Sequence, residues 1–182
     1  MKVLGVVGLP ASGKGEFSKI AAGMGIPVIV MGDMIRHAVK AAGLEPTDTN
    51  FGMTANRLRA EGGMDAIARL CIPDIKARTG PLVLVDGIRG DTEVALFRNH
   101  FPGFILVSID SSFDNRLARI AARARSDDFT SADALHNRDE RELSWGLGKA
   151  LNEADRTITN EGSLEDFSSA VRALLLDLEQ DT

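Results

Sequence analysis

The feature that most constrains the fold is a short apolar run at residues 3–7 that leads directly into a glycine-rich turn at residues 8–15. A continuous run of branched apolar residues is typical of a parallel strand buried on both faces. Helical periodicity follows the turn at once, because Phe17, Ile20 and Ala21 would share one face of a helix. The sequence therefore predicts a strand, a tight turn and a helix in immediate succession.

The same alternation continues along the chain. Further strands are predicted at residues 28–30, 82–85, 104–109 and 157–159. Helices are predicted around residues 17–24, 35–42, 64–75, 117–124, 143–154 and 163–178. Strands that alternate with helices indicate a layered α/β fold around a mainly parallel sheet.

Turn chemistry adds detail to this pattern. Asp33 is the expected N-cap of the second helix, and Pro73 is expected to kink the third. Two polar, turn-rich zones at 44–63 and 125–137 follow predicted strands. We expect them to be loops at the carboxyl edge of the sheet, where ligands bind in folds of this class.

Composition bounds the class of protein. A chain of 182 residues with 44% hydrophobic and 26% charged residues is expected to fold as one domain, 1–182. Its net charge of −5 argues against a broad nucleic-acid surface, so any anion site must be local. Cys71 is the only cysteine and is interpreted as a buried apolar residue. No run approaches a membrane span and no leader pattern is visible, which predicts a cytoplasmic protein without a membrane partner.

The glycine-rich turn has the residues of a phosphate-binding loop. Glycines let the backbone curl around phosphate oxygens, the helix N-terminus adds partial positive charge, and Lys14 adds a full one. The alternative is an ordinary glycine-rich turn between a strand and a helix. The expected nucleotide-binding residues are Gly8, Leu9, Pro10, Ala11, Ser12, Gly13, Lys14, Gly15 and Glu16.

Part of this loop resembles a known family. The segment 10–15 is similar to the phosphate loop of adenylate kinases and other nucleoside monophosphate kinases, which commonly carry glycine at the place of Gly15. Those relatives usually have threonine where this chain has Glu16. The Glu16 carboxylate either holds metal-bound water or turns outward, and the sequence leaves both open.

A second segment, 32–36, resembles the part of adenylate kinases whose arginine binds the acceptor phosphate, which implies that Asp33 and Arg36 lie at the acceptor. Asp86 ends the third strand and is placed to hold Mg²⁺, directly or through water. Arg89 could reach the acceptor, although it comes one position earlier than in the family, and the glutamine with which adenylate kinases read AMP has no counterpart. The alternative for Arg36 is a solvated side chain on a capped surface helix, and the alternative for Asp86 is a carboxylate that caps the next helix.

Arginines gather in the second half of the chain. Arg116, Arg119 and Arg123 recur at one side of a predicted helix, where like charges repel unless an anion lies among them. The run from Arg125 to Arg138 resembles the lid of nucleoside monophosphate kinases. By that resemblance Arg116 stacks on the donor base, whereas Arg119, Arg125 and Arg138 contact phosphates and act in catalysis with Lys14. The alternative is a solvated basic face.

The segment 154–163 resembles the C-terminal part of dephospho-CoA kinases, where Asn160 would approach the donor adenine. As a whole the chain is similar to an archaeal P-loop family related to adenylate kinases and dephospho-CoA kinases. The resemblance implies a three-layer fold with a five-stranded parallel sheet in the order 2-3-1-4-5, an acceptor region at 33–80 and a lid at 123–138. It also implies ATP with Mg²⁺ as donor and a small phosphorylated or hydroxylated acceptor. The alternative is a nucleotide-dependent switch that phosphorylates no small molecule.

Overall fold

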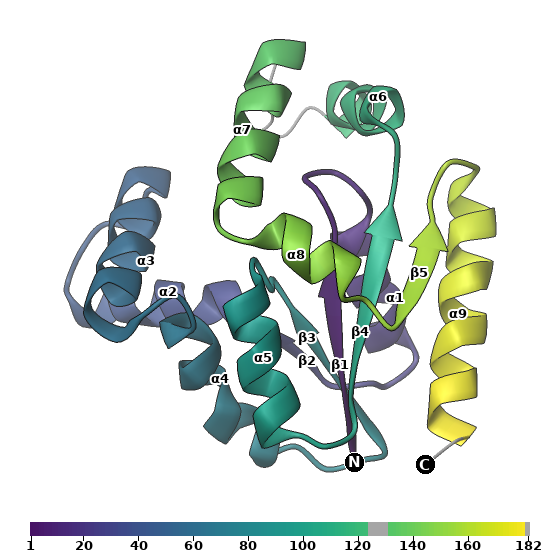
Figure 1. Cartoon of the computed structure of the whole chain (residues 1–182), viewed down its shortest axis with the longest axis horizontal. Helices are drawn as coiled ribbons and strands as arrows, with labels where there is room; N and C mark the ends of the chain where they lie inside the picture. The colour runs from purple at the N-terminus through teal and green to yellow at the C-terminus, as the bar shows by residue number, and fades with distance from the viewer. Residues whose placement is uncertain (124–130, 181–182) are drawn as a thin grey trace.

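The computed structural model describes residues 1–123 and 131–180. Its centre is a five-stranded, all-parallel sheet in the order β2-β3-β1-β4-β5 (Figure 1). The strands are β1 (Lys2–Val7), β2 (Val28–Val30), β3 (Leu82–Asp86), β4 (Phe104–Asp110) and β5 (Arg156–Thr159). The predicted parallel sheet and its strand order are confirmed.

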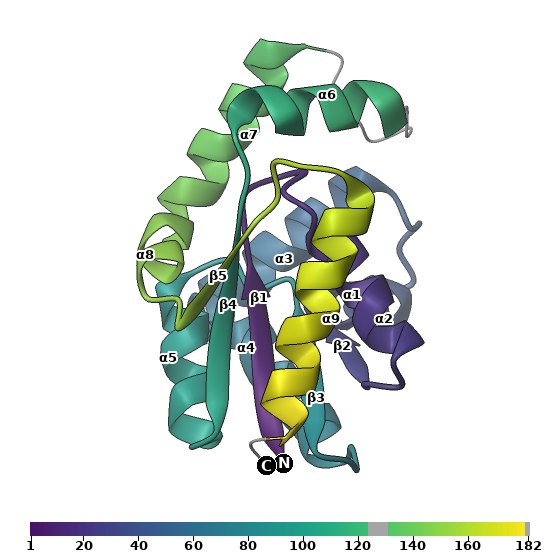
Figure 2. The ribbon, with the colours of Figure 1, turned by 90° about the vertical axis from the view of Figure 1, so that its right-hand side faces the viewer.

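Helices cover both faces of the sheet (Figure 2). One face carries α1 (Lys14–Gly23) and α9 (Leu164–Gln180), and the other carries α4 (Ala66–Lys76), α5 (Asp91–His100) and α8 (Leu147–Asn152). Beside the β2 edge lie α2 (Met31–Ala41) and α3 (Asp48–Gly62). Above the carboxyl ends of the strands lie α6 (Phe113–Arg123) and α7 (Ala132–Ser144), at the end of the molecule opposite the two termini.

The core has two parts because successive side chains of a strand point to opposite faces. Leu4 and Val6 of β1 join Phe17 of α1 on one face, whereas Val3 and Val7 join the cluster under α4 and α5. All five side chains are fully buried. Burial of each large apolar side chain contributes about 1.5–3 kcal/mol, so both layers hold the sheet in place.

The prediction of a loop at 44–63 was wrong, because α3 occupies most of that zone. Thr47 caps this helix by accepting a hydrogen bond on Oγ1 from the Asn50 amide at 3.2 Å. Only a few of its apolar side chains, such as Ala55 and Leu58, pack against the core. The remainder of α3 is mostly polar, and for that reason its periodicity was too weak to be recognised.

Other helix boundaries also differ from the prediction. Asp33 lies within the first turn of α2 rather than at its N-cap, which is Val30. The helix containing Pro73 continues to Lys76. The predicted helix 143–154 is interrupted at Gly146, whose φ of 98° ends α7 and starts α8 in a new direction.

The helix α5 was not predicted, and neither was most of α7. The expectation of a loop at 125–137 was wrong over 132–137, because α7 (Ala132–Ser144) begins there, and residues 125–130 lie outside the described residues. The interpretation of Cys71 as a buried thiol is confirmed. Among residues 1–123 and 131–180, no helix is both long and apolar enough to cross a membrane.

Candidate functional site

The glycine-rich turn joins the end of β1 to the start of α1. Gly13 has a φ of 122°, a conformation that favours glycine, and a Cβ there would lie 2.6 Å from Asn160 Nδ2. The Ser12 amide donates to the Leu9 carbonyl at 3.1 Å, and the Ser12 carbonyl accepts from Asn160 Nδ2 at 2.8 Å. The turn ends at the N-terminus of α1, whose first amide groups lack intrahelical partners and attract anions.

Lys14 is the first residue of α1. Its ammonium donates to the carbonyls of Gly8 and Leu9, the latter at 3.1 Å, so it lies folded against its own loop. Burial, assisted by the positive charge of Arg89, lowers the pKa of Lys14 to about 8, while Glu142 and Asp86 oppose that shift. The ammonium is thus poorly solvated and lies close to a second cation, and a bound anion would stabilise its charged form.

A cleft of about 780 Å³ opens at this point, within the size range of small-molecule sites. It combines the phosphate-loop residues with charged side chains from several elements. Its lining includes Pro10, Ala11, Gly13, Lys14, Gly15, Glu16, Arg36, Asp86, Arg89, Arg119, Arg138, Glu142 and Asn160. Most of the residues predicted from the sequence are therefore brought to one cavity.

On the β5 side of the cleft, Arg119 and Asn160 form a network. Arg119 donates to Ser111 Oγ at 2.8 Å and to the Asn160 carbonyl at 2.6 Å. It also donates to Asn160 Oδ1 at 3.1 Å, while the amide of Asn160 holds the Ser12 carbonyl. Both side chains thus tie α6 and the turn after β5 to the phosphate loop.

Arg116 does not occupy the position expected for stacking on a donor base. Its guanidinium is 3% exposed and forms a bidentate ion pair with Asp139, at 2.8 and 2.7 Å. It also donates to the Pro10 carbonyl at 3.1 Å. The side chain links α6, α7 and the phosphate loop and is absent from the cleft lining. The expected neighbour Arg125 lies outside the described residues.

Asp86 stands at the tip of β3 and lines the cleft with Lys14. Ser18, one turn into α1, donates to Asp86 Oδ2 at 2.8 Å. Residues 1–123 and 131–180 contain no group of three or more potential protein ligands for a metal. One carboxylate beside a polyphosphate site fits Mg²⁺, which usually binds one or two carboxylates, substrate phosphates and water. Glu16 pairs with Lys19 at 3.1 Å, so its carboxylate is turned toward that side chain.

The opposite side of the cleft carries the two arginines expected at the acceptor. Arg36 pairs with Asp33, and both side chains are about half exposed. Arg89 lies deeper, and its Nη1 forms an ion pair with Glu142 Oε1 at 2.7 Å. Arg138 of α7 pairs with the same carboxylate at 3.1 Å.

Comparison with known proteins establishes the family. A UPF0200 protein from Methanoregula boonei is 62% identical over 181 residues, which cover 100% of both chains. The chain belongs to the UPF0200 family. This UPF0200 chain also matches the family model described as an AAA domain over residues 7–136.

Solved structures show the same fold. Shikimate kinase from Acinetobacter baumannii, in complex with shikimate, has a TM-score of 0.60 and 17% identity, over 97% of this chain and 94% of that one. A gluconokinase from Sinorhizobium meliloti 1021 has a TM-score of 0.60 and 20% identity, over 99% and 94%. At this identity the likeness concerns the fold alone. The UPF0200 chain therefore has the P-loop kinase-like fold expected from its sequence.

Two polar residues of the UPF0200 site were not predicted. Ser18 lies four residues after Lys14, and Glu142 lies four residues after Arg138, so each shares a helix side with a predicted site residue. This four-residue spacing was the sequence signal from which Ser18 and Glu142 could have been predicted. Together the groups supply a loop for phosphates, a carboxylate for a hard cation and arginines on both sides, an arrangement suited to moving a phosphoryl group between two bound molecules.

Proposed function

We propose that this UPF0200 protein is an ATP-dependent phosphotransferase that acts on a nucleoside monophosphate or a related small phosphorylated or hydroxylated acceptor. One observation carries the proposal: the cleft that holds Lys14 and Asp86 extends to Arg36 and Arg89 on the side opposite Asn160. A nucleotide-hydrolysing site needs the first pair only. The second pair adds cations where a second anionic molecule would bind.

The donor side belongs to the phosphate loop. Residues 8–16 would hold the phosphate chain with backbone amides and the Lys14 ammonium. Asp86, oriented by the Ser18 hydroxyl, would hold Mg²⁺. A bound Mg²⁺ supplies charge neutralisation on the phosphate oxygens. Asn160 and Arg119 close the β5 side of the same cleft.

The reaction is an in-line transfer. A bond forms between an acceptor oxygen and the terminal phosphorus, the bond from that phosphorus to the bridging oxygen breaks, and ADP leaves with the electron pair. A phosphate oxygen of the acceptor carries no proton that must be removed. The proton of a hydroxyl acceptor would pass to a carboxylate, for which Asp33 beside Arg36 is the candidate.

Arginines would stabilise the charge that spreads over the transferred group. Arg89, Arg119 and Arg138 line the cleft and are proposed for this role together with Lys14. Arg125 of the proposed lid, 123–138, completes the set. The proposed acceptor region, 33–80, holds Asp33 and Arg36.

The test combines binding with turnover. Calorimetry should detect MgATP binding to the purified protein, and Lys14→Met should weaken it by about tenfold or more because one buried charge contact is lost. A coupled assay for ADP release should then respond to one member of a panel of nucleoside monophosphates, dephospho-CoA, shikimate and gluconate. If MgATP binds but no acceptor raises ADP release above the background, kinase activity is refuted and a nucleotide-dependent switch becomes the better description.

A further inference from the structure

Among the described residues, Glu142 is one of three carboxylates, with Glu16 and Asp86, in a cleft lined by a larger number of lysine and arginine side chains. It belongs to α7, outside the central sheet, and its side chain is 2% exposed. No phosphate-site motif marks it in the sequence. Its Oε1 forms an ion pair with Arg89 Nη1 at 2.7 Å and accepts a hydrogen bond from Arg138 Nε at 3.1 Å.

The second oxygen of this carboxylate is also informative. Glu142 Oε2 is buried and accepts no hydrogen bond from the described residues. Burial alone would raise the pKa of Glu142, but the charges of Arg89, Lys14 and Arg138 outweigh it and hold the pKa below its usual value. The carboxylate is therefore a charged group whose main stabilisation is electrostatic and comes from the cations of the cleft.

The cations of the cleft also need a counter-charge. Lys14, Arg89 and Arg138 line one cavity and would repel one another there without an anion. Glu142 offsets that repulsion while the cleft holds no nucleotide. A phosphate chain brings several negative charges to the same cations, and a buried carboxylate among them would then meet like charges in a poorly screened site.

We propose that Glu142 is the internal counter-anion of the transfer site: its carboxylate holds Arg89 and Arg138 in the nucleotide-free protein, and an incoming phosphate chain displaces it. The proposal rests on the proposed function. Glu142 is a positioning residue, since it acts through the two arginines. Displacement breaks the contact of the C-terminal part of α7 with Arg89, whereas the Arg116–Asp139 pair keeps the helix attached to α6.

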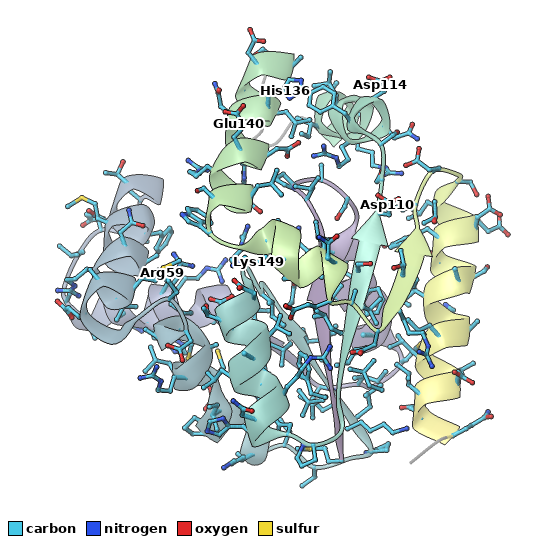
Figure 3. All side chains as sticks on the ribbon, viewed as in Figure 1. Arg59, Asp110, Asp114, His136, Glu140 and Lys149 are labelled. Carbon is cyan, nitrogen blue, oxygen red and sulfur yellow. The ribbon has the colours of Figure 1, made fainter. Side chains whose placement is uncertain are left out.

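The first test compares two variants in which a glutamate of α7 is replaced by uncharged glutamine. Glu142→Gln keeps an oxygen that can accept from Arg138 Nε but removes the charge, and Glu140→Gln removes an exposed charge of α7 (Figure 3). Calorimetry with inorganic tripolyphosphate and with MgATP is run at about pH 6.5, below the pKa of Lys14 of about 8, so that its ammonium stays charged. We expect Glu142→Gln to bind about tenfold more tightly than the wild type, and Glu140→Gln to match the wild type.

The outcomes separate this inference from the proposed function. Equal or weaker binding by Glu142→Gln would overturn the counter-anion while leaving nucleotide binding intact. Binding by Glu142→Gln alone would support the inference, because the wild-type carboxylate then excludes the ligand. If neither protein binds tripolyphosphate or MgATP, the proposed function fails and the inference with it.

A second test needs no variant. Trp145, the only tryptophan of the chain, follows α7, and its ring lies under the guanidinium groups of Arg59 at 5.3 Å and Arg141 at 5.7 Å. Figure 3 shows Arg59 on α3, so this ring joins α7 to a different part of the molecule. Displacement of Glu142 should change Trp145 emission as wild-type protein is titrated with tripolyphosphate. Constant emission during calorimetrically detected binding would contradict displacement of Glu142.

Discussion

The buried pair between Arg116 and Asp139 supports a prediction that also decides what Arg116 does. In Asp139→Asn the guanidinium remains buried at 3% exposure but loses its charged partner. Removing one member of a buried ion pair costs about 3–5 kcal/mol, because the other charge is left uncompensated. For a chain of 182 residues, each kcal/mol lowers Tm by about 2–4 °C, so the expected decrease is about 6–20 °C.

Thermal unfolding followed by circular dichroism measures this decrease. The matched control is the double variant Arg116→Met with Asp139→Leu, in which both charges are replaced by apolar groups of similar size. We expect its Tm to lie close to that of the wild type, since such replacements are often neutral or stabilising. Its affinity for MgATP should also be close to that of the wild type, because Arg116 is absent from the cleft lining.

Two results would refute this reasoning. A Tm decrease below about 2 °C for Asp139→Asn would mean that the pair contributes little to stability. A double variant that unfolds like the wild type but binds MgATP about tenfold more weakly would mean that Arg116 supports the nucleotide site, through its bond to the Pro10 carbonyl or through the base stacking that the sequence suggested.

Three further predictions concern the loop, the lysine and a buried glutamate. Gly13→Ala forces an alanine into a φ of 122° with its Cβ 2.6 Å from Asn160 Nδ2, and urea unfolding should show a loss of about 1–3 kcal/mol. The pKa of Lys14, lowered to about 8, predicts that calorimetric MgATP affinity decreases as pH rises through that value, and Lys14→Arg should abolish this slope. Burial raises the pKa of Glu93 to about 7, so its contribution to stability is present below its usual pKa and is lost as pH rises through 7. Urea unfolding should therefore show Glu93→Gln to be more stable than the wild type at about pH 8, by about 3 kcal/mol. At low pH the two proteins should have equal urea midpoints, because Glu93 is then protonated in both the folded and the unfolded state.

The strands and the phosphate loop could be predicted because their signals are local. A parallel strand buried on both faces must be apolar at successive positions, and residues 3–7 and 82–85 satisfy that condition without reference to any partner. The loop likewise depends on residues that follow one another in the chain. Gly13 and Lys14 take their positions from the turn itself.

The remainder depended on contacts between distant segments. Arg116 and Arg119 lie on the same side of α6 by spacing, yet one is buried against Asp139 and the other reaches Asn160. Nothing in the spacing separates them, because Asp139 follows 23 residues later on another helix. The helix α3 was missed for a related reason, since a short apolar stripe and a capping threonine suffice when neighbouring helices cover it.

The order of the strands has a kinetic consequence under the proposed function. Asn160 follows the strand at one edge of the sheet and Arg36 lies on the helix after the strand at the other, with Asp86 between them. Two molecules that enter from opposite edges can be present together, so neither must depart before the other arrives. Double-reciprocal rate plots at several fixed acceptor concentrations should therefore intersect rather than run parallel, and no phosphorylated form of the protein should accumulate during turnover.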